Sequence, residues 1–230
     1  MAGSERFTDE LRRLAEPIWR AQHEHPFVRG IGAGTVDLDQ FRHWVKQDYL
    51  FLIEYCRVFG LAAARAPDLA TLTRFAQLLT ATATVELELH RGYCREFGIT
   101  EADLEREPMA PTTRGYTDFL LRVAALGDFG ELAAALLPCM WGFSEIGQEL
   151  KTRGLPEQPL CRAWIAMYAD PEFATLAAWC RELVDRLAEA ASPGRRQRLI
   201  DAFLTSSHYE LRFWNMASTL ETWESRQPET

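Results

Sequence analysis

The sequence lacks the features that mark several classes of protein. Its five cysteines are widely spaced and contain no Cys-x-x-Cys pair, which is typical neither of a disulfide framework nor of a zinc site. No uncharged apolar run reaches the roughly 18 residues of a transmembrane helix. Residues 1–6 contain no apolar signal core. Together these absences predict a protein of the reducing cytoplasm, without membrane attachment.

Basic charge is also scarce. The chain has 25 Lys and Arg residues against 33 Asp and Glu residues, which gives a net charge of -8. The densest basic stretch, at residues 194–198, is short and has acidic residues nearby. Because a nucleic-acid-binding surface needs clustered basic side chains, we expect no nucleic-acid partner.

Segments that alternate like β-strands are missing, and apolar residues recur instead at three- and four-residue spacing, as in amphipathic helices. The spacing predicts helices over residues 10–23, 37–66, 68–97, 111–126, 129–151, 159–168, 171–191 and 194–223, with short helical pieces after Thr100. Neither a repeat nor a linker divides the chain. We therefore predict an all-α fold, a single-domain bundle of long antiparallel helices over residues 1–230, with an ordered core at about 5–223.

Two carboxyl groups lie on helix faces that are otherwise apolar. Asp48 lies between Trp44 and Phe51, and Glu210 lies among the aromatic residues of segment 209–214. An unpaired buried carboxylate is costly, so each needs a base, a hydrogen bond or a ligand. Two interpretations stay open for each residue. Asp48 is either a ligand-binding group or the partner of an internal Arg or Lys, and Glu210 is either functional or part of a surface ion pair.

Cys139 follows a proline inside a predicted helix. Pro138 removes a backbone hydrogen bond and kinks the helix axis, and such a kink can expose the neighbouring sulfur to a cavity. Free cysteine is also among the most often buried residues, so a catalytic role and a core role both stay open. The same choice between pocket and core holds for four aromatic residues: Phe51, Tyr116, Phe143 and Tyr168.

A metal site is the next possibility, because di-iron helical bundles use Glu-x-x-His pairs. The sequence contains no such pair, and the nearest spacing is that of Glu86 and His90, four residues apart. His23 and His25 flank a predicted helix end, where we expect exposed imidazoles rather than haem ligands. We therefore expect no metal and no cofactor.

Taken in order, several segments resemble the TenA family, the thiaminase II group within the haem-oxygenase-like all-α fold. The resemblance covers nearly the whole chain. It is carried by LAEPIW at 14–19, HPF at 25–27, WVKQDY at 44–49, AALLPCMW at 134–141, EIG at 145–147 and YELRFWNMA at 209–217. Each segment is weak alone, but their order and separation make the set fairly specific.

The resemblance implies a role for each matching residue. Cys139 matches the nucleophile that adds to a pyrimidine ring, Glu210 matches the carboxylate that moves protons, and Asp48 matches the carboxylate that binds the ring. Tyr116 matches a tyrosine that hydrogen-bonds near the cysteine, and Tyr168 matches a further pocket tyrosine. A free thiol with a pKa of about 8.5 is a few per cent thiolate at neutral pH, and we expect hydroxyl donors or a helix dipole to raise that share.

Two substrate-binding positions depart from the family pattern. Phe51 and Phe143 stand where many members carry a tyrosine, three residues after the aspartate and four residues after the cysteine. Both keep the aromatic ring and lose the hydroxyl, so stacking is retained while hydrogen bonds are lost. A site that has lost a buried donor discriminates differently among substrates, so the reaction type is better supported than the substrate.

The resemblance therefore predicts a cofactor-free hydrolase. Its reaction would convert 4-amino-5-aminomethyl-2-methylpyrimidine into the hydroxymethyl form and ammonia in thiamin salvage, with weak thiamin cleavage at most. It also implies a homotetramer. One alternative is an oxidase of the same fold, similar to the enzyme of pyrroloquinoline quinone biosynthesis or to the di-metal oxidases. Another is a non-catalytic pyrimidine-binding or regulatory protein.

Overall fold

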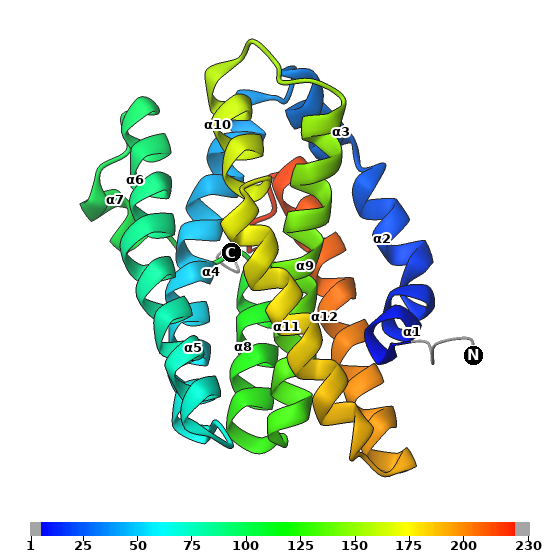
Figure 1. The fold of residues 1–230 in the computed structure, drawn as a ribbon. Coiled ribbons are helices and arrows are strands. Elements are labelled where there is room, and N and C mark those ends of the chain that lie inside the picture. The colour runs from blue at the N-terminus through cyan, green and yellow to red at the C-terminus, as the bar shows by residue number, and fades with distance from the viewer. Residues whose placement is uncertain (1–5, 224–230) are drawn as a thin grey trace, which may run out of the picture.

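The computed structural model describes residues 6–223, and every regular element in that range is a helix (Figure 1). This confirms the all-α prediction, while the predicted domain's ends at 1–5 and 224–230 lie outside the described residues. The elements are α1 (Phe7–Leu14), α2 (Glu16–His23), α3 (Pro26–Ala33), α4 (Leu38–Arg65), α5 (Leu69–Ala81), the π-helix η1 (Thr82–Glu86), α6 (Leu87–Glu96), α7 (Glu101–Arg106), α8 (Pro111–Leu126), α9 (Phe129–Thr152), α10 (Pro159–Tyr168), α11 (Pro171–Glu189) and α12 (Pro193–Thr219).

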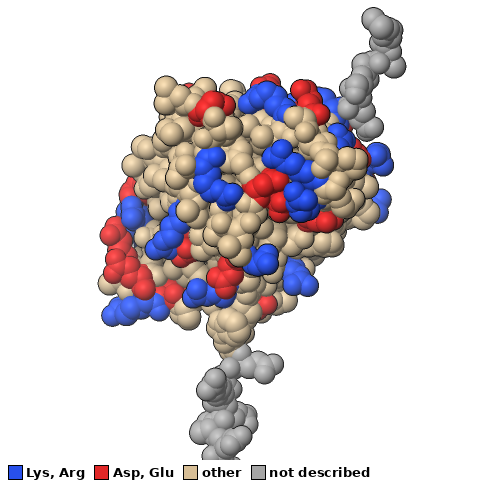
Figure 2. Space-filling model, turned by 90° about the horizontal axis from the view of Figure 1, so that it is seen from below, with Lys and Arg blue, Asp and Glu red and all other residues tan. Residues whose placement is uncertain are grey.

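Helix α9 lies in the middle of the bundle and packs against α8, α10, α11 and α12. Helix α4 packs against α5, α6 and α8, so α8 lies between α4 and α9 (Figure 1). Buried apolar side chains from all of these helices form a connected core. No helix within residues 6–223 combines the length and the apolar character needed to cross a membrane. On the face shown in Figure 2, basic and acidic side chains are interspersed rather than separated by sign.

The first predicted helix is in fact two helices, and a third follows that the periodicity did not predict. Pro17 lacks the N–H that would continue the hydrogen-bond ladder, and the helix breaks at Ala15 between α1 and α2. Pro26 then opens α3, with the His25 ring accepting a hydrogen bond from the Phe27 N–H. The expectation of exposed imidazoles is wrong, because His25 is buried and His23 contacts Glu145 and Glu149.

The predicted helix at 68–97 is helical throughout but changes its winding. Its middle, Thr82–Glu86, is a π-helix between α5 and α6. Helical periodicity in the sequence does not reveal such a wider turn, and π-helical turns are often found at functional sites. The last helix ends at Thr219, four residues before the predicted end, because Leu220 adopts a left-handed conformation with φ of 52°.

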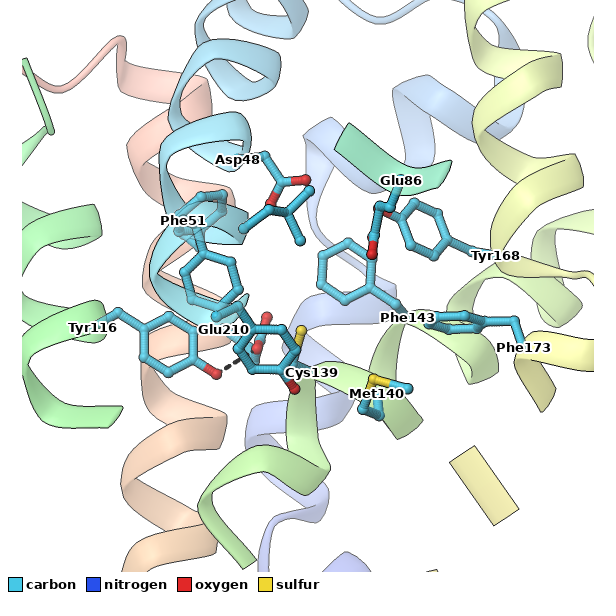
Figure 3. Close-up of a pocket in the computed structure, with 13 residues that line it drawn as sticks. Asp48, Phe51, Glu86, Tyr116, Cys139, Met140, Phe143, Tyr168, Phe173 and Glu210 are labelled. Carbon is cyan, nitrogen blue, oxygen red and sulfur yellow. Dashed lines mark hydrogen bonds between the residues drawn. The ribbon is translucent and has the colours of Figure 1, made fainter. Parts of the chain in front are cut away.

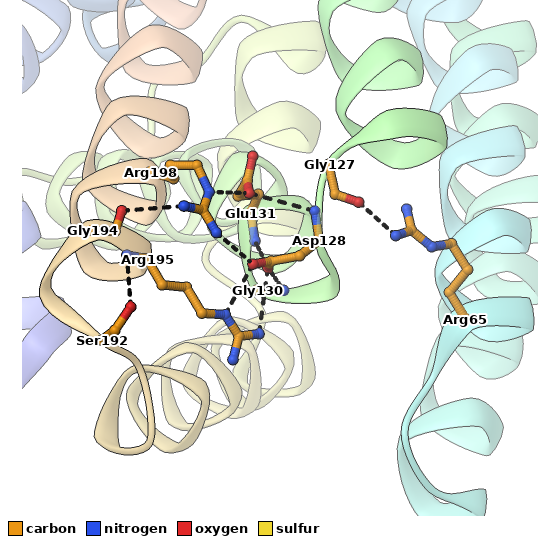
Figure 4. Close-up of polar contacts among 9 residues, drawn as sticks. All are labelled: Arg65, Gly127, Asp128, Gly130, Glu131, Ser192, Gly194, Arg195 and Arg198. Atoms are coloured by element: carbon orange, nitrogen blue, oxygen red, sulfur yellow. Dashed lines mark hydrogen bonds and ion pairs between the residues drawn. The ribbon is translucent and has the colours of Figure 1, made fainter.

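The start of α9 is held by ion pairs that fix its position along the bundle (Figure 4). Asp128 caps the helix together with Glu131 in a capping box. Arg195 and Arg198 at the start of α12 pair with these two carboxylates. Arg65 at the end of α4 donates to carbonyls at the end of α8. Cys139 lies about three turns farther along α9. These contacts therefore fix the position of Cys139 along the axis of the bundle.

Candidate active site

A pocket lies between the central helices, and its mouth and interior hold about 420 Å³ of space not filled by protein atoms (Figure 3). Its lining combines aromatic and apolar side chains with a few polar groups, as in sites for small organic ligands. All seven residues predicted from the sequence line it, from α4, α8, α9, α10 and α12. The lining residues are Asp48, Phe51, Leu52, Tyr55, Glu86, Tyr116, Cys139, Met140, Phe143, Tyr168, Phe173, Glu210 and Phe213.

Glu210 projects from α12 into this pocket and is only 3% exposed. The Tyr116 hydroxyl donates to its Oε1 over 2.5 Å (Figure 3). Burial raises the pKa of Glu210 to about 8, although hydrogen bonds from Tyr116 and Cys139 work in the opposite direction. The surface ion pair considered for Glu210 is therefore wrong. The carboxyl group is instead placed to exchange a proton near neutral pH.

Cys139 is partly exposed toward the same pocket. Burial raises the pKa of its thiol well above the ordinary value, and the carboxyl groups of Glu210, Glu86 and Asp48 raise it further. A hydrogen bond from Tyr55 works against this shift without offsetting it. Tyr55 thus acts in the direction expected of a hydroxyl donor, but in this pocket burial and the carboxyl groups outweigh it. The thiol is neutral there and needs a base before it can act as a nucleophile.

The interrupted backbone around Pro138 is stabilised by side chains of other helices. The proline cannot donate to the carbonyl four residues earlier. The neighbouring carbonyls of Ala135 and Leu136 accept hydrogen bonds from Ser206 and Tyr55, over 2.7 Å and 3.1 Å. The Ser206 hydroxyl also lies 2.8 Å from that of Tyr116. The segment beside Cys139 is thus tied to α4, α8 and α12.

Asp48 is buried on α4, and its partner is a histidine rather than the Arg or Lys considered from the sequence. His90 Nε2 lies 2.6 Å from Asp48 Oδ2. The other ring nitrogen, Nδ1, lies 2.9 Å from the backbone carbonyl of Glu86. Asp48 still lines the pocket. Its carboxyl group is therefore available to a ligand while it is also bound to His90.

Glu86 is a pocket residue that the sequence interpretation did not select. It ends the π-helix, and its Oε1 accepts a hydrogen bond of 3.2 Å from Tyr168. Burial raises the pKa of Glu86 to about 7, with Asp48 raising it and His90 lowering it. The four-residue spacing of Glu86 and His90 was noticed in the sequence. It was considered only as a possible pair of metal ligands. Tyr55 and Ser206 were also missed, because nothing in their own segments distinguishes them from core residues.

Phe51 and Phe143 form aromatic walls of the pocket. The Phe51 ring lies 5.0 Å from Tyr116 and 5.2 Å from Tyr55, measured between ring centroids. The Phe143 ring lies 4.8 Å from Tyr168 and 5.1 Å from Trp214. These rings are held by neighbouring aromatic side chains, so a planar ligand can stack on them without reordering the wall.

The polar groups of the pocket are mostly acidic. Of the residues that the structure describes, three carboxyl groups line it, those of Asp48, Glu86 and Glu210, and no Lys or Arg does. Within residues 6–223, no three His, Cys, Asp or Glu side chains are arranged to hold a metal ion. The arrangement offers a thiol in contact with a carboxyl group of raised pKa, and a second carboxyl group held by a histidine. These are the groups needed for nucleophilic addition with proton transfer to an anchored ring.

Comparison with known proteins points to one family. Residues 12–220 match the TENA/THI-4/PQQC family. A relative from Halalkalibacterium halodurans, named aminopyrimidine aminohydrolase, is 42% identical over 218 residues, which are 94% of this chain and 97% of that protein.

Solved structures agree with this match. A protein from Silicibacter sp. TM1040, described as a TenA family transcription regulator, superimposes with a TM-score of 0.86 at 32% identity, covering 93% of this chain and 96% of its own. A domain of unknown function from Shewanella denitrificans OS217, described as having a haem-oxygenase-like fold, superimposes with a TM-score of 0.71 at 12% identity, covering 93% and 92%. The second likeness concerns the fold alone, and it confirms the predicted fold class.

Proposed function

The chain belongs to the TENA/THI-4/PQQC family, and from this premise we propose that it is an aminopyrimidine aminohydrolase of thiamin salvage. The proposed reaction converts 4-amino-5-aminomethyl-2-methylpyrimidine and water into the hydroxymethylpyrimidine and ammonia. One observation carries the proposal: a single buried pocket contains the Cys139 thiol, the Glu210 carboxyl group and the Asp48 carboxyl group. The name of the Halalkalibacterium halodurans relative supports the substrate class.

In this proposal Cys139 is the nucleophile and Glu210 moves the protons. The thiol is neutral because its pKa is raised, so Glu210 in its ionised form takes the thiol proton as the sulfur adds to the ring. The aminomethyl group, protonated near neutral pH as a primary alkyl amine is, then leaves as ammonia. Glu210 holds the thiol proton until the sulfur is released and returns it then, and the proton lost by the attacking water goes to the ammonia. Water supplies the oxygen of the new carbon–oxygen bond, and the sulfur is released. A pKa of about 8 leaves both forms of Glu210 accessible near neutral pH.

The remaining pocket residues position the ring. Asp48 accepts hydrogen bonds from the ring's amino group, and Phe51 and Phe143 stack on its faces. Tyr116 donates to Glu210 and so lowers the pKa of that carboxyl group toward the working range. Tyr168 contributes a hydroxyl on the opposite wall, where it donates to Glu86.

Thiamin is the less favoured substrate in this proposal, with weak cleavage at most. The rings of Phe51 and Phe143 offer stacking but no hydroxyl groups, so any hydrogen bond that a tyrosine would supply there is missing. Loss of a buried donor changes which ligands a site rejects. The relative rates for thiamin and for the aminomethylpyrimidine therefore measure what these two positions select.

The proposal also includes features of the whole protein. We expect one domain, a cytoplasmic location and a homotetramer, the last because related proteins of the family are expected to assemble in this way. Sedimentation equilibrium on the purified chain measures the assembly directly. A monomer at micromolar concentration would contradict the tetramer and leave the proposed chemistry unaffected.

The direct test is an assay of ammonia release and hydroxymethylpyrimidine formation from the aminomethylpyrimidine, with thiamin in parallel. Cys139→Ser should abolish turnover and keep ring binding, because Asp48 and the aromatic walls remain. Cys161→Ser is a matched control, because Cys161 is buried outside the pocket. Normal turnover by Cys139→Ser would refute the nucleophile assignment. Pyrimidine binding without turnover by the unaltered protein would favour a regulatory role instead.

A further inference from the structure

Glu86 is a half-buried acidic residue that the proposed chemistry does not use. It lies in the π-helix between α5 and α6, and the wider turn directs its side chain into the pocket (Figure 3). Its two oxygens accept from neutral hydroxyl groups only, Oε1 from Tyr168 at 3.2 Å and Oε2 from Thr82 at 3.4 Å. Within residues 6–223 neither oxygen is paired directly with a cationic side chain, although the charge of His90 lowers the pKa of the group. A ligand cation would therefore gain a direct contact with this carboxylate.

We propose that Glu86 binds the protonated aminomethyl group of the substrate and makes the pocket selective for this cation over the neutral hydroxymethyl product. The inference rests on the proposed function and goes beyond it, because it assigns the recognition of the leaving group. Glu86 would act as a specificity-determining residue, while Cys139 and Glu210 carry out the bond changes.

The charge distribution around the pocket supports this assignment. Among residues 6–223, the base near Glu86 is His90, and its ring is already engaged by Asp48 on one side and by the Glu86 backbone carbonyl on the other. No Lys or Arg of the described part of the chain lines the pocket. A primary alkyl amine is protonated near neutral pH, as the lysine amine is. Its ammonium group therefore supplies the positive charge that the pocket lacks, and it can donate hydrogen bonds to the carboxylate.

The arrangement of the three carboxyl groups allows each of them to contact a different part of the substrate. Figure 3 shows Asp48, Glu86 and Glu210 around different sides of the pocket, with Cys139 next to Glu210 and Tyr168 next to Glu86. A ring held by Asp48 can thus present its substituent to Glu86 while its reacting carbon is near Cys139. The thiazolium group of thiamin is cationic but has no N–H to donate, so a hydrogen-bonding carboxylate favours the primary amine.

The selectivity also has a consequence for turnover. Once the carbon–nitrogen bond is broken, the product carries a neutral hydroxymethyl group in place of the ammonium group. The charge-assisted hydrogen bond to Glu86 is then lost, and a charged contact contributes more than a neutral one. The pocket should therefore hold substrate more tightly than product, which favours product release.

The test compares two ligands that differ only in this charge. Dissociation constants for the aminomethyl- and hydroxymethylpyrimidine are measured by calorimetry in Cys139→Ser, which does not consume the amine, and in Cys139→Ser with Glu86→Gln. The amine should bind about tenfold or more weakly after the second substitution, a change of about 1.4 kcal/mol. The affinity for the hydroxymethyl compound should stay within about twofold.

Glu88→Gln is the matched control, because it removes the same charge from an exposed position two residues away, where Glu88 pairs with Arg91 and Arg95. It should leave both affinities unchanged. Glu86→Asp is the second variant, since it keeps the charge and should keep a preference for the amine even if Glu86→Gln does not fold. A lost preference in Glu86→Asp would overturn the inference.

The remaining outcomes separate this inference from the proposed function. Equal weakening of both ligands by Glu86→Gln would mean that Glu86 only supports the pocket, and no weakening would mean that it binds no cation. Either result overturns the inference while ammonia release by the unaltered protein still supports the hydrolase. If the unaltered protein neither binds nor hydrolyses these pyrimidines, the proposed function and the inference both fall.

Discussion

His90 and Asp48 form a buried pair at the back of the pocket, with Nε2 and Oδ2 2.6 Å apart. The opposite ring nitrogen, Nδ1, lies 2.9 Å from the carbonyl of Glu86, and because a carbonyl only accepts, Nδ1 carries a proton. Burial lowers the pKa of His90, but the hydrogen bond and charge of Asp48, with the charge of Glu86, raise it overall. The histidine is therefore positioned to hold Asp48 as a charged partner.

Replacing His90 should affect substrate binding more than the chemical step. His90→Gln removes the charged partner of Asp48 and its fixed orientation, so KM for the aminomethylpyrimidine should rise about tenfold, within the range of a hydrogen bond to a charged group. The value of kcat should change less, because in the proposed mechanism Asp48 anchors the ring and transfers no proton. Steady-state kinetics measure both constants. His43→Gln, at a buried histidine outside the pocket, is the control. A large fall in kcat at unchanged KM would assign His90 to the chemistry instead.

Glu210→Gln should stabilise the folded protein, and the gain should increase as the pH rises from about 4.5 to about 8. Burial holds the pKa of Glu210 at about 8 in the folded protein, against 4.5 as its ordinary value. Across this window the unfolded chain releases a proton that the folded protein keeps, so the folded state loses up to about 1.4 kcal/mol per pH unit. Glutamine removes this loss while retaining an acceptor for Tyr116.

Thermal denaturation at several pH values measures this effect, at about 2–4 °C in Tm per kcal/mol for a protein of this size. Glu88→Gln is the matched control, because the exposed Glu88 has a lowered pKa through its contacts with Arg95 and Arg91. It should show no gain that grows with pH. A gain for Glu210→Gln that stays constant from acid to alkaline pH would show that burial of the charge is not its cause.

Two glycines of α9 should respond in opposite ways to alanine. A Cβ at Gly147 would lie 2.6 Å from the backbone carbon of Tyr168, whereas a Cβ at Gly142 would meet nothing within 4 Å. Gly147→Ala should therefore push α10 away, destabilise the protein by about 1–3 kcal/mol and lower turnover by displacing the Tyr168 ring. Gly142→Ala should stabilise it by about 0.5–1 kcal/mol through helix propensity. Denaturant unfolding of both variants measures the difference, and similar effects of the two would contradict the close packing of α9 on α10.

Much of the fold was predictable because its signals are local. Apolar spacing indicated the long helices, and the helix predicted at 111–126 has the same bounds as α8. The errors in the predicted helices occurred where the same local sequence pattern is compatible with more than one backbone conformation. Pro17 splits the first helix rather than being tolerated within it, and the π-helix preserves helical periodicity on both sides while inserting a wider turn.

The sequence by itself determined the helical architecture and seven pocket residues, because helical spacing and the resemblance both depend on residues close together in the chain. Only the tertiary structure decided how those residues are charged and paired. Asp48 and His90 come from different helices, and so do Glu86 and Tyr168. The raised pKa values of Cys139 and Glu210 arise from burial among several helices. Desolvation and coupling between carboxyl groups depend on distances in space, which no single segment of the chain contains.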